Sequence, residues 1–329
     1  MPQRFLVTGG AGYVGSHLVA ALVERGDTAV VLDNLRTGHR GAVLPGARLV
    51  VADLADTDTV DAILADGPWH AVFHFAALSQ VGESMRLPFQ YLIDNGVNGM
   101  RLIEGCVRHN IMRFVLSSTA ALYGAPRTVP ISEEAPLDPE SPYGDSKWML
   151  ERTLLWAERI HGLRYASLRY FNAAGADPGE RLGEDHRPES HLIPLVIDAA
   201  LGRRPALQVY GTDYPTPDGT CIRDYVHVTD LADAHLLALA QLEQGSISVN
   251  LGNGTGHSVL EVIEAVERVS HRKVPYSIAS RRSGDPAVLV ASSERARQQL
   301  GWQPRLTDLD EIVRTALRWR EAHPDGYVD

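Results

Sequence analysis

The stretch that decides the fold runs from Phe5 to Gly15 and reads FLVTGGAGYVG. Its apolar start is typical of a buried strand, and Val14, Leu18 and Leu22 then recur every four residues, like one stripe of a helix. Glycines between strand and helix let the backbone bend and approach a pyrophosphate, to which the helix N-terminus offers N–H groups. The stretch therefore predicts a strand, a glycine turn and a helix that bind a dinucleotide.

The second apolar run supplies an acidic partner for this loop. It ends at Asp33, 18 residues after Gly15. A carboxylate there accepts hydrogen bonds from the adenosine ribose hydroxyls and repels a 2′-phosphate, which favours NAD over NADP. Arg36 keeps NADP open as an alternative, and a glycine-rich turn without any ligand is the simpler one. Asp53 and Leu54, at the end of the third run, resemble an adenine-binding corner.

Further apolar runs follow at residues 29–32, 49–51, 71–73, 114–116 and 165–168. They are continuous rather than alternating, as expected of parallel strands covered on both faces. The sequence therefore predicts an α/β fold: a Rossmann-type, doubly wound parallel sheet with a smaller C-terminal α/β substrate domain. We expect the NAD-binding domain at 1–172, rejoined by a segment near 226–252, and the interleaved substrate domain at 173–329, with a ligand cleft between them.

Composition excludes several classes of function. The chain has 329 residues, with 31 basic and 41 acidic side chains and a net charge of −10, which gives no support for nucleic-acid or membrane binding. No apolar run reaches membrane-spanning length, no signal peptide precedes the first strand, and two cysteines cannot build a disulfide framework. We expect a cytoplasmic protein without a metal site.

Only two of the 31 basic residues are lysines, Lys147 and Lys273. Lys147 follows Tyr143 by four residues, so both side chains face one side of a helix. A nearby cation favours the phenolate form, which makes Tyr143 a usable general base for an alcohol proton. An exposed Tyr/Lys pair on a helix is the simpler alternative. Lys273 has no such neighbour and is expected on the surface.

The run Leu116 to Gly124 places Ser117, Ser118 and Thr119 at the end of the fifth strand. In an open α/β sheet the carboxyl ends of the strands face the ligand crevice. A hydroxyl from Thr119 can therefore bond a reacting alcohol or carbonyl there. Taken alone, such residues after a strand are usually turn formers.

The glycine loop, Asp33, Ser-Ser-Thr and Tyr-x-x-x-Lys, in this order, resemble the extended short-chain dehydrogenase/reductase family. Within it, the segments 81–84, 169–172, 183–185, 211–225 and 281–285 look like the UDP-glucose (UDP-galactose) 4-epimerases. The resemblance implies an enzyme that epimerises a UDP-hexose at C4 with bound NAD, through a 4-keto sugar that turns over in the site. It also implies a homodimer, formed through the helices near 87–110 and 143–161.

The resemblance also implies specific residues. Tyr143 is the base, Thr119 bonds the 4-oxygen, and Lys147 tunes Tyr143 and holds the ribose. The residues expected to bind NAD are Gly9, Gly12, Tyr13, Val14, Gly15, Asp33, Asn34, Asp53, Leu54, Phe75, Ala76, Ala77, Ser117, Tyr143, Lys147 and Phe171. The residues expected to bind the UDP-sugar are Thr119, Asn172, His191, Leu192, Tyr210, Arg223, Arg282, Asp285 and Leu289.

Three positions depart from the family pattern. A lysine that the family often carries is Ser79 here, and the asparagine expected directly before Val97 is replaced by Gly96, with Asn95 one position earlier. An extra residue between Leu87 and Asn95 predicts a bulge in that helix. The position that limits sugar size falls on Leu289, smaller than tyrosine and larger than cysteine, so N-acetylated UDP-hexosamines are expected to fit.

Other functions remain as alternatives. UDP-pentose or UDP-uronate epimerisation uses the same chemistry at C4. Nucleotide-sugar dehydratases resembling this chain carry Asp-Glu directly after the catalytic threonine, whereas Ala120 and Ala121 stand here and offer no acid or base for elimination. A non-catalytic NAD-binding protein would predict loss of Tyr143 or Lys147, and both are present.

Overall fold

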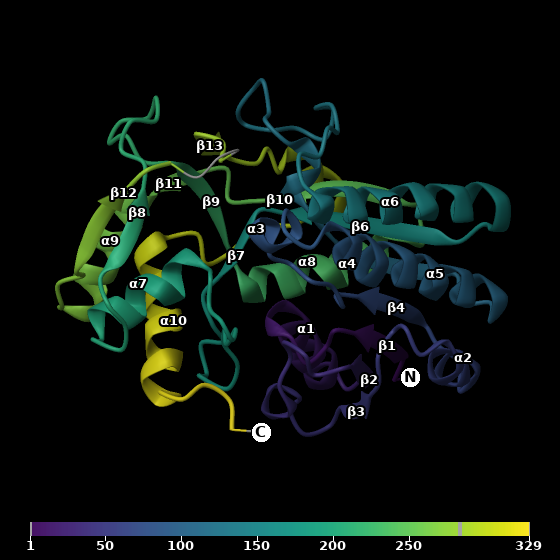
Figure 1. Cartoon of the computed structure of the whole chain (residues 1–329). Helices are drawn as coiled ribbons and strands as arrows, with labels where there is room; N and C mark the ends of the chain where they lie inside the picture. The colour runs from purple at the N-terminus through teal and green to yellow at the C-terminus, as the bar shows by residue number, and fades with distance from the viewer. Residues whose placement is uncertain (1, 282–284, 329) are drawn as a thin grey trace.

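A seven-stranded parallel sheet organises the N-terminal half of the chain (Figure 1). The computed structural model describes residues 2–281 and 285–328. The strands lie in the order β10-β6-β5-β4-β1-β2-β3. Their bounds are β1 (Arg4–Thr8), β2 (Thr28–Asp33), β3 (Arg48–Val51), β4 (Ala71–His74), β5 (Arg113–Thr119), β6 (Arg164–Tyr170) and β10 (Ile247–Leu251). The strand order reverses direction between β1 and β4, where ligands bind in open sheets of this type.

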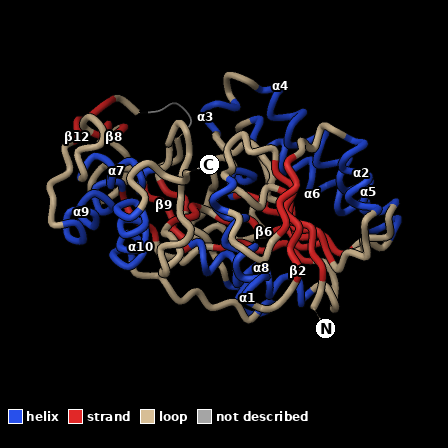
Figure 2. The backbone as a smooth tube through the Cα atoms, turned by 90° about the horizontal axis from the view of Figure 1, so that it is seen from below, coloured by secondary structure: helices blue, strands red, loops and turns tan. Residues whose placement is uncertain are grey.

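Helices cover both faces of this sheet, as Figure 2 shows from below. One face packs against α1 (Tyr13–Glu24) and α8 (Val228–Gln241). The other face packs against α2 (Thr57–Ala65), α5 (Asn98–Arg108) and α6 (Pro142–His161). The strands are therefore buried on both sides, which explains why their sequences are continuously apolar. The predicted doubly wound α/β fold is confirmed.

The C-terminal half forms a smaller α/β unit around its own core, at the left of Figure 1. Its helices are α7 (Leu192–Ala200), α9 (Val259–Ser270) and α10 (Leu309–Ala322). Its strands are β7 (Asn172–Ala174), β8 (Leu207–Tyr210), β9 (Ile222–His227), β11 (Gly256–Ser258), β12 (Tyr276–Ala279) and β13 (Val288–Leu289). Because β7 follows β6 directly and pairs with β9, the two units are joined where the large sheet ends.

No helix of the described residues is long and apolar enough to cross a membrane. Six short helical elements complete the set described. They are η1 (Arg40–Ala42), α3 (Val81–Ser84), α4 (Pro88–Tyr91), η2 (Leu92–Val97), η3 (Ala120–Tyr123) and η4 (Ala296–Leu300).

The helical bulge predicted between Leu87 and Asn95 is present as the π-helix η2, between α4 and α5. The bulge turns Asn95 inward, so that its Oδ1 accepts a hydrogen bond from the Leu78 N–H at 2.8 Å. Its Nδ2 donates to the Leu78 carbonyl at 2.9 Å and to Ser146 Oγ at 3.2 Å. Asn95 thus fastens the loop after β4 to helix α6.

A buried ion pair ties β5, β6 and α6 together. The guanidinium of Arg169 donates two hydrogen bonds to the carboxylate of Glu151, at 3.0 and 2.6 Å, and each side chain is only 7% exposed. Glu151 also accepts from Ser118 Oγ at 2.6 Å, and Arg169 donates to the hydroxyl of Tyr123 at 2.9 Å. Since Ser118 directly precedes Thr119, this network fixes the end of β5.

We expect Arg169→Met to lower the free energy of unfolding by about 3–5 kcal/mol, because Glu151 would keep a buried charge without its partner. Urea denaturation monitored by circular dichroism measures this loss. The matched control is Arg268→Met, which removes an arginine bonded twice to Asp310 at the exposed surface. That change should cost less than about 1 kcal/mol. Equal losses in the two variants would contradict the importance of the buried pair.

Candidate active site

A cleft with a volume of about 1180 Å³ lies between the large sheet and the C-terminal unit. It is lined by the carboxyl ends of β1, β2, β4 and β5 on one side and by α7, β8, β9 and β13 on the other. Every site residue predicted from the sequence lines this cleft, except Arg282, which lies outside the described residues.

The glycine turn forms the floor of the cleft. Gly9 has a positive φ of 72°, and a Cβ there would lie 2.3 Å from the backbone nitrogen of Ala76. A Cβ on Gly15 would lie 2.3 Å from the carbonyl oxygen of Gly9. Helix α1 then begins after Gly12, without any side chain capping its first N–H groups. The turn is therefore shaped to let an anionic pyrophosphate approach the helix N-terminus.

Asp33 stands beside this turn at the end of β2. Its carboxylate accepts hydrogen bonds from the Ala11 N–H at 3.0 Å and the Leu35 N–H at 2.9 Å. Burial raises the pKa of this carboxyl, and the two backbone hydrogen bonds oppose the rise. Arg36, which kept NADP open, forms an ion pair with Asp94 at 3.4 Å. A carboxylate at the ribose position and an engaged arginine together favour NAD.

Tyr143, Thr119 and Lys147 meet at the end of β5. Helix α6 begins where Ser141 Oγ accepts a hydrogen bond from the Gly144 N–H at 3.2 Å, which puts Tyr143 in its first turn. The hydroxyl of Thr119 lies close enough to Tyr143 to lower the pKa of its phenol. Lys147, one turn further and only 1% exposed, donates to the Ser117 carbonyl at 2.8 Å. The structure thus brings together the three residues predicted to be catalytic.

The electrostatics of this group differ from the expectation of an acidic Tyr143. Burial raises the pKa of Tyr143, and the nearby Thr119 hydroxyl offsets only part of that rise. Burial also lowers the pKa of Lys147 from 10.5 to about 8. Low dielectric surroundings disfavour both charged forms. The phenolate therefore needs additional positive charge in the cleft.

Tyr91 supports Tyr143 and was not identified from the sequence. The two rings meet edge to face, with centroids 6.5 Å apart. Tyr91 is fully buried and donates its hydroxyl hydrogen to Glu83 at 2.7 Å. Glu83 belongs to the segment 81–84 that carried the family resemblance, but the contact joins helices α3 and α4 and leaves no periodic signal in the sequence.

The residues predicted to bind the substrate lie across the cleft from Tyr143. Arg223 donates a hydrogen bond to Asp285, forming an ion pair, and Leu289 is aligned with Arg223 on the neighbouring strand β13. Asn172 donates to the Asp224 carbonyl at 3.0 Å. Tyr210 ends β8, and His191 and Leu192 open α7. One wall thus carries the amide, guanidinium, carboxylate and aromatic groups of the predicted substrate set.

A model of the NAD dependent epimerase/dehydratase family matches residues 5–252. The chain belongs to this family. A UDP-glucose 4-epimerase of Streptococcus mutans serotype c is 48% identical over 331 residues, covering 99% of each chain.

Solved structures of epimerases match over nearly the whole chain as well. A crystal structure of a UDP-glucose 4-epimerase has a TM-score of 0.97 at 46% identity and covers 99% of this chain and 100% of that one. A UDP-glucose 4-epimerase from Bifidobacterium longum, in complex with NAD⁺ and UDP, has a TM-score of 0.94 at 34% identity and covers 99% of this chain and 100% of that one.

The family includes both epimerases and dehydratases, and the residues that line the cleft help to distinguish the two. Ala120 and Ala121 line it directly after Thr119. Their methyl groups supply no acid or base for eliminating water. The site therefore favours the epimerase branch of the family.

The burial of Lys147 is expected to make the free energy of unfolding of the nucleotide-free protein depend on pH. Its folded pKa of about 8 lies below the 10.5 of the unfolded chain, so only the unfolded chain stays protonated between these values. The free energy of unfolding therefore rises with pH in this window and is lowered most below pH 8. From pH 7 to 10 the wild type should gain about 2–3 kcal/mol relative to Lys147→Met.

Urea denaturation at several pH values measures this difference. Lys273→Met is the matched control, because Lys273 is 91% exposed and paired with Glu267 on the surface. Its pH profile should run parallel to that of the wild type in this range. A parallel profile for Lys147→Met would show that burial does not perturb Lys147.

Proposed function

We propose that the protein catalyses the reversible, NAD-dependent 4-epimerisation of a UDP-hexose, interconverting UDP-glucose and UDP-galactose. The observation that carries this proposal is that Tyr143, Thr119 and buried Lys147 line one cleft, where Lys147 donates a hydrogen bond to the Ser117 carbonyl at 2.8 Å. One end of the cleft has the glycine turn and Asp33, and the opposite wall has Arg223 and Asp285. Similarity to UDP-glucose 4-epimerases over 99% of the chain supports it.

The residues at the sheet edge fit NAD. The uncapped start of α1 suits the pyrophosphate, Asp33 suits the adenosine ribose, and Asp53, which accepts from Asn34 Nδ2 at 2.6 Å, borders the adenine side. NAD, when bound, supplies reversible oxidation at C4 of the sugar. We propose that the remaining NAD contacts come from Phe75, Ala76, Ala77, Ser117 and Phe171, together with the other predicted cofactor residues.

Tyr143 removes the proton of the sugar 4-hydroxyl and returns one when the 4-keto sugar is reduced. Thr119, which lines the cleft beside Tyr143, holds the 4-oxygen within reach of the phenol. Lys147 holds the nicotinamide ribose, and its ammonium favours the phenolate. Because inversion requires the keto sugar to present its opposite face, the sugar must be held loosely while the nucleotide is held firmly.

The nucleotide is held by the wall opposite Tyr143. Guanidinium groups bind phosphate oxygens in pairs, so Arg223, with Arg282 and Asn172, is assigned to the diphosphate. Asp285 is assigned to the uridine ribose. Its hydrogen bonds to the ribose hydroxyls would replace part of the ion pair that Asp285 forms with Arg223. Tyr210 is assigned to the uracil. His191 and Leu192 lie along the diphosphate and the sugar.

Two alternatives share this chemistry. UDP-N-acetylhexosamines differ from UDP-hexoses by bulk at C2, and UDP-pentoses or UDP-uronates differ at C5, so each tests the size and charge of the cleft rather than the proton transfer.

We also propose the division of the chain into an NAD-binding domain at 1–172, rejoined near 226–252, and a substrate domain at 173–329. A cytoplasmic location is proposed because two cysteines in 329 residues cannot build a disulfide framework.

Product analysis with purified protein tests the activity. Wild type should convert UDP-galactose to UDP-glucose, and Tyr143→Phe should lower turnover by about 10²-fold or more, because the general base is lost while the buried ring remains. Tyr165→Phe, which removes another tyrosine hydroxyl, is the matched control and should keep wild-type turnover. Turnover by Tyr143→Phe close to wild type would overturn the assignment, and no turnover by wild type on any UDP-sugar would leave a non-catalytic NAD-binding protein.

Leu289 is expected to set the size of sugar that the cleft admits. Wild type should act on both UDP-galactose and UDP-N-acetylgalactosamine. Leu289→Tyr should reduce turnover of the N-acetylated substrate at least tenfold more than that of UDP-galactose, because the larger ring takes the room of the acetamide group. The same product assay on both substrates measures this ratio, and inactivity of wild type on the N-acetylated sugar would contradict the expectation.

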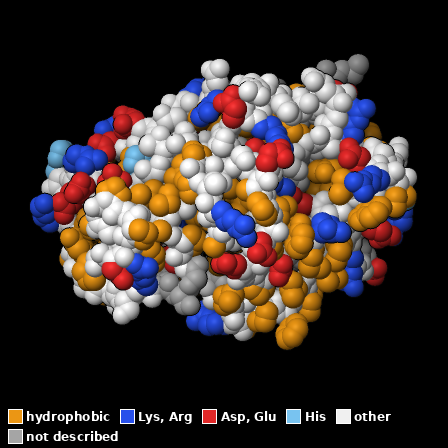
Figure 3. Space-filling view, turned by 90° about the horizontal axis from the view of Figure 1, so that it is seen from above, with side chains coloured by type: hydrophobic (Ala, Val, Ile, Leu, Met, Phe, Trp, Pro, Cys, Tyr) orange, Lys and Arg blue, Asp and Glu red, His pale blue; other side chains and the backbone are white. Residues whose placement is uncertain are grey.

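We propose that the protein forms a homodimer through the outer face of helices α4, η2 and α6. This face exposes large apolar side chains, in contrast to the charged side chains common on a protein surface: Phe89 (77% exposed), Ile93 (52%), Trp156 (51%) and Ile160 (67%). Figure 3 shows hydrophobic side chains gathered on the half of the molecule that holds these helices. Contiguous apolar surface of this kind marks a protein–protein contact. A second copy of the chain would bring the same face and cover it symmetrically.

Ile160→Arg is expected to convert the dimer to a monomer, because a guanidinium would be buried in an apolar interface. Light scattering coupled to size-exclusion chromatography measures the molecular mass. Ile278→Arg is the matched control, since Ile278 is 56% exposed on β12 in the other unit, and it should leave the mass unchanged. A monomeric wild type at micromolar concentration would contradict the dimer.

A further inference from the structure

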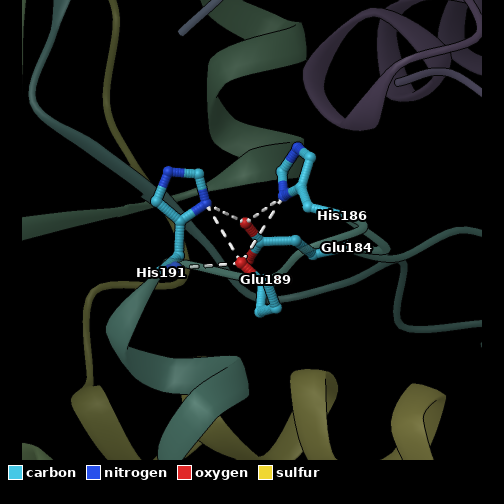
Figure 4. Close-up of side chains that lie close together, drawn as sticks. All are labelled: Glu184, His186, Glu189 and His191. Atoms are coloured by element: carbon cyan, nitrogen blue, oxygen red, sulfur yellow. Dashed lines mark hydrogen bonds and ion pairs between the residues drawn. The ribbon is translucent and has the colours of Figure 1, made fainter. Parts of the chain in front are cut away.

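A compact group of four side chains lies in the wall of the cleft: Glu184, His186, Glu189 and His191 (Figure 4). Three come from the loop that follows β7, and His191 is the residue at which α7 begins. Each offers one nitrogen or oxygen atom, and these atoms all lie within 4.8 Å of one another. The proposed epimerisation uses only His191 of this set.

We propose that these four side chains bind a divalent transition metal ion, with Zn²⁺ as the preferred ion. Imidazole nitrogen and carboxylate oxygen are ligands that zinc takes in four-coordinate, tetrahedral sites. This site is separate from the reacting group at Tyr143, and it shares only His191 with the proposed substrate wall.

The spacing of the ligand atoms suits a tetrahedral ion. Ligands about 2.0–2.1 Å from zinc in a tetrahedron lie about 3.3 Å from one another. Here Nδ1 of His186 is 3.2 Å from Oε1 of Glu184 and 3.7 Å from Oε1 of Glu189. Nδ1 of His191 is also 3.7 Å from Oε1 of Glu189, and it is in hydrogen-bond contact with Glu184. For an ion to enter, this last pair has to separate and the pairs at 3.7 Å have to close slightly.

The two rings are oriented for a shared ligand. Figure 4 shows Nδ1 of His186 and Nδ1 of His191 turned toward the carboxylates, with the other ring nitrogens turned away. Nδ1 of His186 is buried and has no hydrogen-bond partner of good geometry among the described residues. Its nearest partners are the two carboxylates of the cluster, at 3.2 and 3.7 Å, and a shared metal ion would give this nitrogen a directed bond.

The charge of the cluster also suits one divalent ion. Zinc takes neutral imidazole and carboxylate ligands. Two neutral imidazoles, two carboxylates and one Zn²⁺ sum to zero charge, so the bound ion would leave no net charge in the wall.

Four protein ligands close a tetrahedral site, which is the pattern of structural rather than catalytic zinc. The ion would join the loop at Glu184–Glu189 to the first turn of α7. It would thereby hold the start of α7, where His191 and Leu192 line the cleft. The expected consequence is a more stable fold of this segment rather than a new reaction.

The test uses the full chain without a histidine tag, stripped of metal by a chelator and dialysed at pH 8. Isothermal titration with ZnCl₂ should show one ion bound per chain, and the midpoint of thermal unfolding should rise by several degrees. CaCl₂ should give neither signal, because calcium prefers oxygen ligands. Absence of a zinc-dependent signal in the wild type would overturn the proposal.

Two variants locate the ion. His186→Asn/Glu189→Gln should lose the bound ion and the rise in the unfolding midpoint, and single His186→Asn should weaken binding at least tenfold if the double variant does not fold. The matched control is His109→Asn. His109 also pairs with a carboxylate, since its Nε2 is 2.7 Å from Oδ1 of Asp61, but neither residue lines the cleft. It should keep one zinc per chain. Zinc retained at wild-type affinity by His186→Asn would place the ion elsewhere and overturn the proposal.

Discussion

The close approach of two backbone segments at Gly9 sets the geometry of the whole cleft. The turn after β1 lies against the turn after β4 so tightly that a Cβ on Gly9 would lie 2.3 Å from the nitrogen of Ala76. Both turns sit where the strand order reverses, so the space above them is open to a ligand rather than filled by a crossover helix. A side chain at Gly9 would force the turns apart and close the approach to the start of α1.

Buried polar contacts then transmit this geometry to the reacting groups. Arg169 and Glu151 join β6 to α6, and Ser118 joins the same carboxylate to β5. Lys147 lies one turn before Glu151 on α6 and bonds the Ser117 carbonyl. The helix that carries Tyr143 and the strand that carries Thr119 are thus held by the same few hydrogen bonds. Such a network is costly to break, so its conformation is well defined.

Local patterns in the sequence predicted the sheet, the glycine turn and the Tyr143–Lys147 pair, because each depends on spacing along one strand or helix. The π-helix was also predictable, since one extra residue displaces Asn95 by a fixed step. Contacts between distant segments were not predictable: the pairing of Arg223 with Asp285 and the packing of Tyr91 on Tyr143 arise only when the chain folds. The cluster around His186 was not predicted, and no metal site was expected from the sequence. Glu-x-His-x-x-Glu-x-His is visible from residue 184, but the spacing alone also suits a solvated loop.

The ionisation of the site follows from burial rather than from the Tyr143–Lys147 spacing alone. Burial disfavours charge on Tyr143 and on Lys147 alike, so the ligand-free cleft favours a neutral phenol and a weakened ammonium. A positive charge brought into the cleft would stabilise the phenolate, while Lys147, with a pKa of about 8, keeps its proton at neutral pH. The base therefore becomes effective only when the cleft is occupied. The same reasoning explains how a chain of net charge −10 binds a diphosphate: the local groups at the cleft, and not the overall charge, determine the interaction.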